Sequence, residues 1–191
     1  SRGIAGFRTP PEIAALLGRY MDRAERLGAN MMTVHLGSCP VGEDRAEALR
    51  SVAEGVRLAT PELERRRIRI ALENHTAAII SNALGDRPEE FDWLMANVAP
   101  EFVGMTFDVG HAHINGHLDD FLDRPLGRVF NMHLHDNDGT TDDHQPLGKG
   151  SIRWKKVLRR IASKCYQGTF TLEFFSSAAE YRSSMAMIRE A

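Results

Sequence analysis

The chain has 191 residues, 42% of them hydrophobic and 26% charged, which predicts one packed domain over residues 1–191 and excludes global disorder. Its formal net charge of -2 excludes a strongly basic protein that coats nucleic acid, and no apolar run is long enough to span a bilayer. Two cysteines, Cys39 and Cys165, are too few for a disulfide framework and fit either a reducing compartment or plain core thiols. We expect a cytoplasmic location.

Helix-like segments alternate with short apolar runs along the whole chain. Thr9-Pro10-Pro11-Glu12 has the pattern of a capping box with proline in the first turn, which predicts the start of a helix. In chain order, the pattern predicts a helix at 9–27, a strand at 31–36, helices at 43–58 and 60–67, a strand at 68–72, a helix at 88–98, a strand at 103–107, a helix at 118–122, a strand at 129–134, a helix at 154–164, a strand at 169–174 and a helix at 178–191.

Five strands, each followed by a helical segment, predict a parallel sheet with right-handed crossover connections. The strands carry apolar residues on both faces, which is typical of a sheet covered on both sides. This pattern fits a doubly wound sheet and a barrel equally well.

Each of the five strands ends its apolar run in a residue that can bind a metal ion. These residues are His35, Glu73, Asp108, His133 and Glu173. Burying so many carboxylates and imidazoles together is very costly without a cation. The carboxyl ends of parallel strands are also where α/β proteins place their chemistry. The pattern therefore favours a functional metal site over a set of unrelated structural residues.

Further candidate ligands lie in the loops that follow these strands. His111 lies three residues after Asp108, and Asp142 and His144 lie in the loop after the fourth strand. Nitrogen and oxygen ligands without paired thiols suit Zn²⁺, Mn²⁺, Fe²⁺ or Co²⁺ rather than a cysteine-rich structural zinc site.

Several short motifs together resemble the xylose isomerase-like TIM-barrel superfamily, which includes sugar and sugar-phosphate isomerases and epimerases and the type-IV AP endonucleases. The motifs are Leu72-Glu73-Asn74, Phe107-Asp108-Val109-Gly110-His111, His133-Leu134-His135-Asp136, the stretch from Asp142 to Gly150, and Leu172-Glu173. The resemblance implies a (βα)8 TIM barrel of which this α/β chain carries the last five strands. We therefore expect three strands upstream of Ser1, or else a partner that covers the open edge.

The resemblance implies one divalent metal ion (Mn, Zn, Co or Fe) held by Glu73, Asp108, His133 and Glu173. In the isomerase and epimerase branch, the two glutamates are also catalytic: they move protons at a carbon next to a carbonyl, through an enediolate. A hydride shift is the variant used by some members, and the sequence does not separate the two.

The same branch implies a small-molecule carbohydrate substrate. His111 resembles the substrate-contacting histidine of the family, and His35 is a second candidate substrate contact. Lys149 lies between two glycines and is a candidate contact for a substrate phosphate, although the alternative of a solvent-exposed turn residue is favoured. Many family members form homo-oligomers, but no interface is recognisable in this sequence.

The endonuclease branch is the alternative. It implies a site of two or three zinc ions, with His35, His111, Asp142 and His144 as additional metal ligands. This chain departs from that branch at Val109-Gly110, where a Thr-Cys pair is usual, and at His135, where asparagine is usual. Its basic runs fit ordinary solvated helix faces, so we do not expect a nucleic-acid partner. A non-enzymatic binding module is a third, disfavoured interpretation.

Overall fold

The computed structural model describes residues 3–5, 9–39 and 42–191. Its helices are α1 (Pro10–Arg26), α2 (Arg45–Arg66), α3 (Pro88–Ala96), α4 (Val109–Ile114), α5 (Leu118–Asp123), α6 (Trp154–Ser163) and α7 (Ala178–Arg189). Its strands are β1 (Met31–His35), β2 (Arg69–Glu73), β3 (Val103–Asp108), β4 (Val129–Leu134) and β5 (Thr169–Leu172). The five predicted strands are confirmed.

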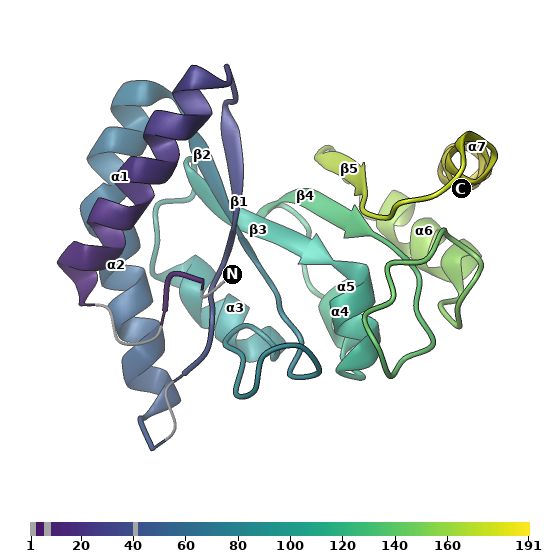
Figure 1. The fold of residues 1–191 in the computed structure, drawn as a ribbon, viewed down its shortest axis with the longest axis horizontal. Helices are drawn as coiled ribbons and strands as arrows, with labels where there is room; N and C mark the ends of the chain where they lie inside the picture. Colours follow the sequence, from purple (N-terminus) through teal and green to yellow (C-terminus); the bar gives the residue numbers. More distant parts are fainter. Residues whose placement is uncertain (1–2, 6–8, 40–41) are drawn as a thin grey trace.

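All five strands are parallel and lie in one sheet in the order β1-β2-β3-β4-β5, which is also their order in the sequence. In Figure 1 the sheet twists from β1, beside α1 and α2, to β5, near α7. A doubly wound sheet reverses its strand order at a switch point, and this sheet does not. The sequential order is that of a barrel wall, so the five strands form a half-barrel.

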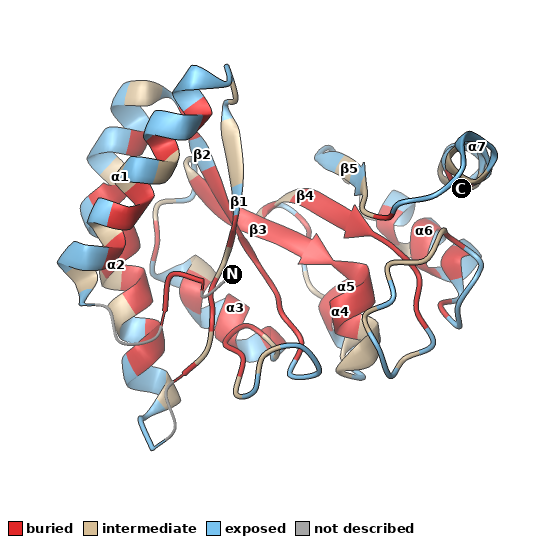
Figure 2. Ribbon diagram, in the orientation of Figure 1, coloured by how far each residue is buried: buried red, intermediate tan, exposed pale blue. Residues whose placement is uncertain are grey.

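Burial follows the position of each strand in this half-barrel. Figure 2 shows β2, β3 and β4 buried, whereas β1 and β5, at the two edges, are more exposed. Edge exposure is expected where a sheet has no further strand to pair with. Among the described helices, none is both long enough and apolar enough to cross a bilayer.

The helix α1 begins as its sequence pattern predicts. The backbone N–H of Thr9 donates to Glu12 Oε2 at 2.8 Å, and the capping box is complete. Its apolar face, which includes Ile13, packs against α2 at Gly55, where a Cβ atom would lie 2.6 Å from the Ile13 Cβ. The absence of a side chain at Gly55 therefore permits the close approach of the two helices.

Two differences from the predicted elements have a physical reason. Helices were expected at 43–58 and 60–67, but α2 is a single helix that continues through Pro61. Val56 and Leu63, on either side of the proline, are fully buried, so one continuous apolar face outweighs the lost backbone hydrogen bond. The short helix α4 was not predicted, because its sequence of valine, glycine and histidine has weak helix propensity.

Replacing Pro61 by alanine is expected to stabilise the fold by about 1–3 kcal/mol, because an N–H at position 61 restores a hydrogen bond in the middle of α2. Thermal unfolding of the variant, followed by circular dichroism, measures the effect. Leu58→Ala, at an exposed position of the same helix, serves as the control and should change stability little. A lower melting temperature for Pro61→Ala would contradict this account of α2.

Candidate metal centre

The register of the sheet brings the predicted ligands to one edge. Asp108 pairs with His133 across β3 and β4, and His35 pairs with Glu73 across β1 and β2. Glu173 follows the last residue of β5 directly. Because the strands are parallel, all five end on the same side of the sheet, so side chains from distant parts of the sequence meet there.

Glu73, Asp108, His133 and Glu173 form a group that we call the first cluster. Each offers one ligand atom, and these atoms all lie within 4.8 Å of one another. His133 Nδ1 lies 2.8 Å from Glu73 Oε1, 2.8 Å from Glu173 Oε2 and 3.8 Å from Asp108 Oδ2. The structure thus brings together all four residues that were expected from the sequence to hold one metal ion.

The charges of the first cluster fit a divalent cation. Burial lowers the pKa of His133, but its contacts with Glu173 and Glu73 outweigh this and raise it to about 10. Burial raises the pKa of Glu73, and its bonds to His133 and His35 more than reverse that, so the net shift is downward. A single N–H faces two carboxylates at 2.8 Å and can satisfy only one of them fully, whereas a dication can bind both.

Asp108 is held in place by its backbone as well as its side chain. Asn74 Nδ2 donates to the carbonyl oxygen of Asp108 at 2.8 Å, and the N–H of Asp108 donates to Asn74 Oδ1 at 2.7 Å. The N–H of His111 donates to Asp108 Oδ1 at 2.7 Å, so Asp108 also caps α4. No role was predicted for Asn74, although its position directly after the candidate ligand Glu73 could have indicated one.

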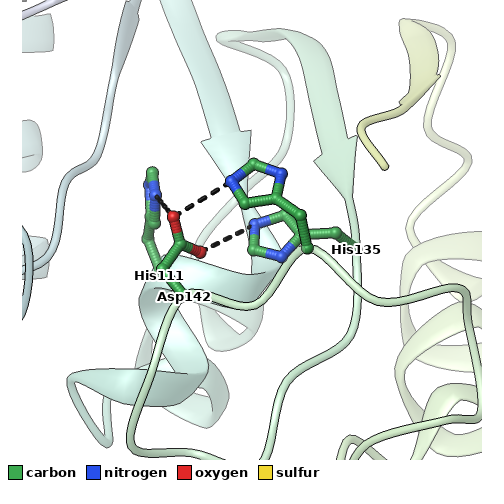
Figure 3. A group of neighbouring side chains, drawn as sticks. His111, His135 and Asp142 are labelled. Atoms are coloured by element: carbon green, nitrogen blue, oxygen red, sulfur yellow. Dashed lines mark hydrogen bonds and ion pairs between the residues drawn. The ribbon is translucent and has the colours of Figure 1, made fainter. Parts of the chain in front are cut away.

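A second group lies beside the first and is drawn in Figure 3. It consists of His111, His135, Asp142 and His144, whose ligand atoms also lie within 4.8 Å of one another, and we call it the second cluster. Asp142 Oδ2 lies 3.0 Å from His144 Nε2 and 3.5 Å from His111 Nε2, and Asp142 Oδ1 lies 3.6 Å from His135 Nε2. Three of these four residues were expected as additional metal ligands.

Two histidines of the second cluster are oriented by backbone carbonyl groups. His111 Nδ1 donates to the carbonyl oxygen of Asn74 at 2.9 Å, and His144 Nδ1 donates to that of Glu173 at 2.6 Å. A carbonyl oxygen can only accept, so Nδ1 carries the proton and Nε2 is the nitrogen free to bind a metal ion. Metal-binding histidines in proteins are commonly fixed in this way.

The second cluster also has the electrostatics of a cation site. Burial raises the pKa of Asp142, but its bonds to His111 and His144 outweigh this and lower it well below its usual range. The bond to Asp142 raises the pKa of His144 to about 9. Burial lowers the pKa of His111, but Asp108 and Asp142 outweigh this and raise it to about 10. Buried Asp142 Oδ1 accepts no hydrogen bond from the described residues, which leaves a lone pair for a metal ion.

The loop after β4 is fastened at its base by Asp136. Its backbone exchanges hydrogen bonds with Gln145 at 2.7 and 2.9 Å. Its carboxylate accepts from the N–H groups of Gly148 at 2.8 Å and Ile152 at 3.2 Å, and from Trp154 Nε1 at 2.9 Å. These bonds fix the segment that carries the two loop residues of the second cluster.

His35 and Lys149, the two remaining site residues predicted from the sequence, do not lie together. His35 Nε2 lies 2.6 Å from Glu73 Oε2, so His35 borders the first cluster. Lys149 is exposed, and its Nζ lies 3.9 Å from Glu180 Oε1 of α7 rather than beside either cluster. A contact of Lys149 with a substrate phosphate stays a prediction.

Two further histidines at this site had no role assigned from the sequence. His135 lies two residues after His133, and alternation along an extended segment places both side chains on the same side, which was an available signal. The His75 ring packs between those of His35 and His111, with centroids 4.9 and 5.0 Å away. Burial, followed by the charge of His111, lowers the pKa of His75 to about 4, so its ring is neutral at pH 7.

A family model described as xylose isomerase-like TIM barrel matches residues 10–191. Among curated relatives, the uncharacterised protein MJ1311 of Methanocaldococcus jannaschii is 28% identical over 163 residues, which are 80% of this chain and 53% of that protein. A probable endonuclease 4 of Protochlamydia amoebophila is 29% identical over 150 residues, which are 70% of this chain and 52% of that protein. The chain thus spans about half the length of these relatives.

Solved structures share the same fold. A D-tagatose 3-epimerase-like protein superposes with a TM-score of 0.82 at 23% identity, over 98% of this chain and 72% of that one. The TTHB071 protein of Thermus thermophilus, from a crystal soaked with ZnCl₂, superposes with a TM-score of 0.67 at 26% identity, over 95% of this chain and 72% of that one.

Metal uptake is expected to release protons and to strengthen as the pH rises from about 6 to about 8. The raised pKa values of His133, His111 and His144 keep these rings protonated at pH 7 in the metal-free protein, and a metal ion must displace the protons. Calorimetric titration with ZnCl₂ in two buffers of different ionisation enthalpy measures the release. An uptake heat that does not depend on the buffer would contradict the protonated clusters.

Proposed function

The chain belongs to the xylose isomerase-like TIM-barrel family, and we propose that it is a divalent-metal-dependent isomerase or epimerase of a sugar or sugar phosphate. The family includes enzymes of several reaction classes, so the fold alone does not select this one. The observation that carries the proposal is the convergence of two glutamates, from β2 and from the end of β5, on one nitrogen atom of His133.

These glutamates suit proton transfer on two sides of a substrate. Glu73 ends β2 and Glu173 follows β5, and β3 and β4 lie between these two strands. The two glutamates therefore reach His133 from different directions. The Glu73 side chain is 2% exposed, whereas that of Glu173 is 40% exposed and can exchange protons with solvent. Epimerisation at a carbon next to a carbonyl needs one group that removes a proton and another that returns one.

The residues of the first cluster would hold the metal ion that such a reaction requires. A divalent ion bound by Glu73, Asp108, His133 and Glu173 would supply Lewis-acid stabilisation of the negative charge that develops on the substrate. His35, whose Nε2 lies 2.6 Å from Glu73 Oε2, would orient the buried glutamate for its proton transfer. His111, which is presented from α4, would donate or accept a hydrogen bond at a substrate oxygen.

The ligand atoms of the first cluster also limit which metal ions can bind there. They consist of carboxylate oxygens and imidazole nitrogens, which suit Mn²⁺, Zn²⁺, Co²⁺ or Fe²⁺. The zinc-soaked crystal of the Thermus relative makes zinc the first ion to test. The proposed ligand is a small carbohydrate rather than a macromolecule.

A second candidate function is zinc-dependent hydrolysis of a phosphodiester at an abasic site in DNA. The second cluster is the specific observation that favours it, because adjacent metal ions are typical of phosphodiester hydrolysis. Relatives named as probable endonuclease 4 point in the same direction. One bound ion favours the sugar enzyme, and two or three zinc ions favour the nuclease.

Glu173→Gln is expected to lower the rate on the correct sugar by about 100- to 10,000-fold, because it removes a proton-transferring carboxylate that also binds the metal. A panel of ketoses and their phosphates, incubated in D₂O, reports turnover and also separates proton exchange from a hydride shift. Glu101→Gln, an exposed carboxylate away from both clusters, is the control and should retain full activity. A Glu173→Gln protein with unchanged turnover would rule out the assigned role.

Elemental mass spectrometry is expected to detect bound metal in the purified protein. The metal content per chain should be lower in the Glu73→Gln and Glu173→Gln variants. An oligonucleotide duplex with one abasic site tests the second candidate directly. Cleavage that requires zinc and is abolished by Asp142→Asn, without activity on any ketose, would replace the isomerase proposal with the nuclease. A wild-type protein that binds no metal would refute both.

A further inference from the structure

The three histidines of the second cluster differ in which ring nitrogen is held. His111 and His144 donate from Nδ1 to backbone carbonyl oxygens, which leaves Nε2 free to bind a cation. His135 has the opposite arrangement. Its Nε2 lies 3.1 and 3.3 Å from the two oxygens of Asp108, and its Nδ1 has no hydrogen-bond partner among the described residues.

The proton of His135 is therefore located on Nε2. Both oxygens of the Asp108 carboxylate face Nε2 of His135, and Oδ1 also accepts from the N–H of His111, so the carboxylate is the acceptor and Nε2 is the donor. An Nε2 that donates to Asp108 has no lone pair for a metal ion. Moving the proton to Nδ1 would bury an N–H group without an acceptor, which is costly in a fully buried ring.

Gly110 fixes the His135 ring in this position. A Cβ atom on Gly110 would lie 2.1 Å from Cε1, 2.4 Å from Nε2 and 2.6 Å from Nδ1 of His135. The edge of the ring that carries both nitrogens therefore packs directly against the first turn of α4, where only glycine leaves room for it. This packing restricts rotation of the ring, and Nε2 stays nearer to the two oxygens of Asp108 than to Asp142 Oδ1, which is 3.6 Å away.

We propose that His135 is a positioning residue for the first cluster, holding Asp108 through Nε2–H, and is not itself a metal ligand. This inference rests on the metal dependence proposed above.

Glutamine and asparagine at position 135 form a matched pair of variants that tests this inference. The amide nitrogen of glutamine reaches the place of Nε2 and can still donate to Asp108, whereas that of asparagine reaches only the place of Nδ1. Each variant is combined with Asp142→Asn to isolate the first cluster, or with Glu173→Gln to isolate the second. Glu173→Gln leaves the backbone carbonyl that orients His144 in place.

Zinc affinity is measured by competition with a chelator, and far-UV circular dichroism checks folding. In the Asp142→Asn background, His135→Asn is expected to weaken zinc binding by about 10–100-fold, and His135→Gln to restore it. In the Glu173→Gln background, both variants are expected to bind zinc as tightly as the parent. Gly110→Ala, which displaces the ring without altering any ligand, should reproduce the loss caused by His135→Asn.

Two outcomes would overturn the inference. If both variants lose zinc in the Glu173→Gln background, His135 is a metal ligand in the second cluster. If His135→Asn leaves the first cluster unchanged in the Asp142→Asn background, His135 does not position Asp108. A wild-type protein that binds no zinc fails differently, because it also refutes the proposed metal dependence.

Discussion

Charge balance at the carboxyl edge of the sheet is the constraint on which the structure depends. Parallel pairing brings the buried Glu73 and Asp108 and the partly exposed Glu173 together with the imidazole of His133. Such a group of carboxylates is stable only when positive charge accompanies it. Without a metal ion, protons on the imidazoles provide that charge, as the raised pKa of His133 indicates. A divalent ion provides it with better geometry, because it can contact several carboxylates at once.

The start of α4 links the two clusters. Asp108 ends β3, belongs to the first cluster and caps the helix, and one turn later the helix presents His111 to the second cluster. Asn74 joins both, since it binds the backbone of Asp108 and orients the ring of His111 through its carbonyl group. The distance between the clusters is therefore set by one strand-to-helix turn. A change in this turn would therefore move both clusters together.

Proteins similar to this chain include a probable endonuclease 4 and a D-tagatose 3-epimerase-like protein. The half-barrel provides a rigid edge of ligands, and the loops that follow the strands add further ligands to it. The chemistry at such an edge depends on how many ions are bound and on what the open positions accept. In this chain the loop after β4, fastened by Asp136, supplies Asp142 and His144 and thus a second set of donors.

Local sequence patterns were sufficient to predict the five strands and the polar residue that ends each of them, because these are short-range features. The choice of four of these residues as one ligand set came from the resemblance to a family. Contacts between distant residues set the features that these patterns missed. The buried apolar face of α2 keeps the helix continuous at Pro61. Lys149 lies beside Glu180 rather than beside the clusters. The place of His135, between Asp108 and the first turn of α4, likewise follows from packing that no local pattern encodes.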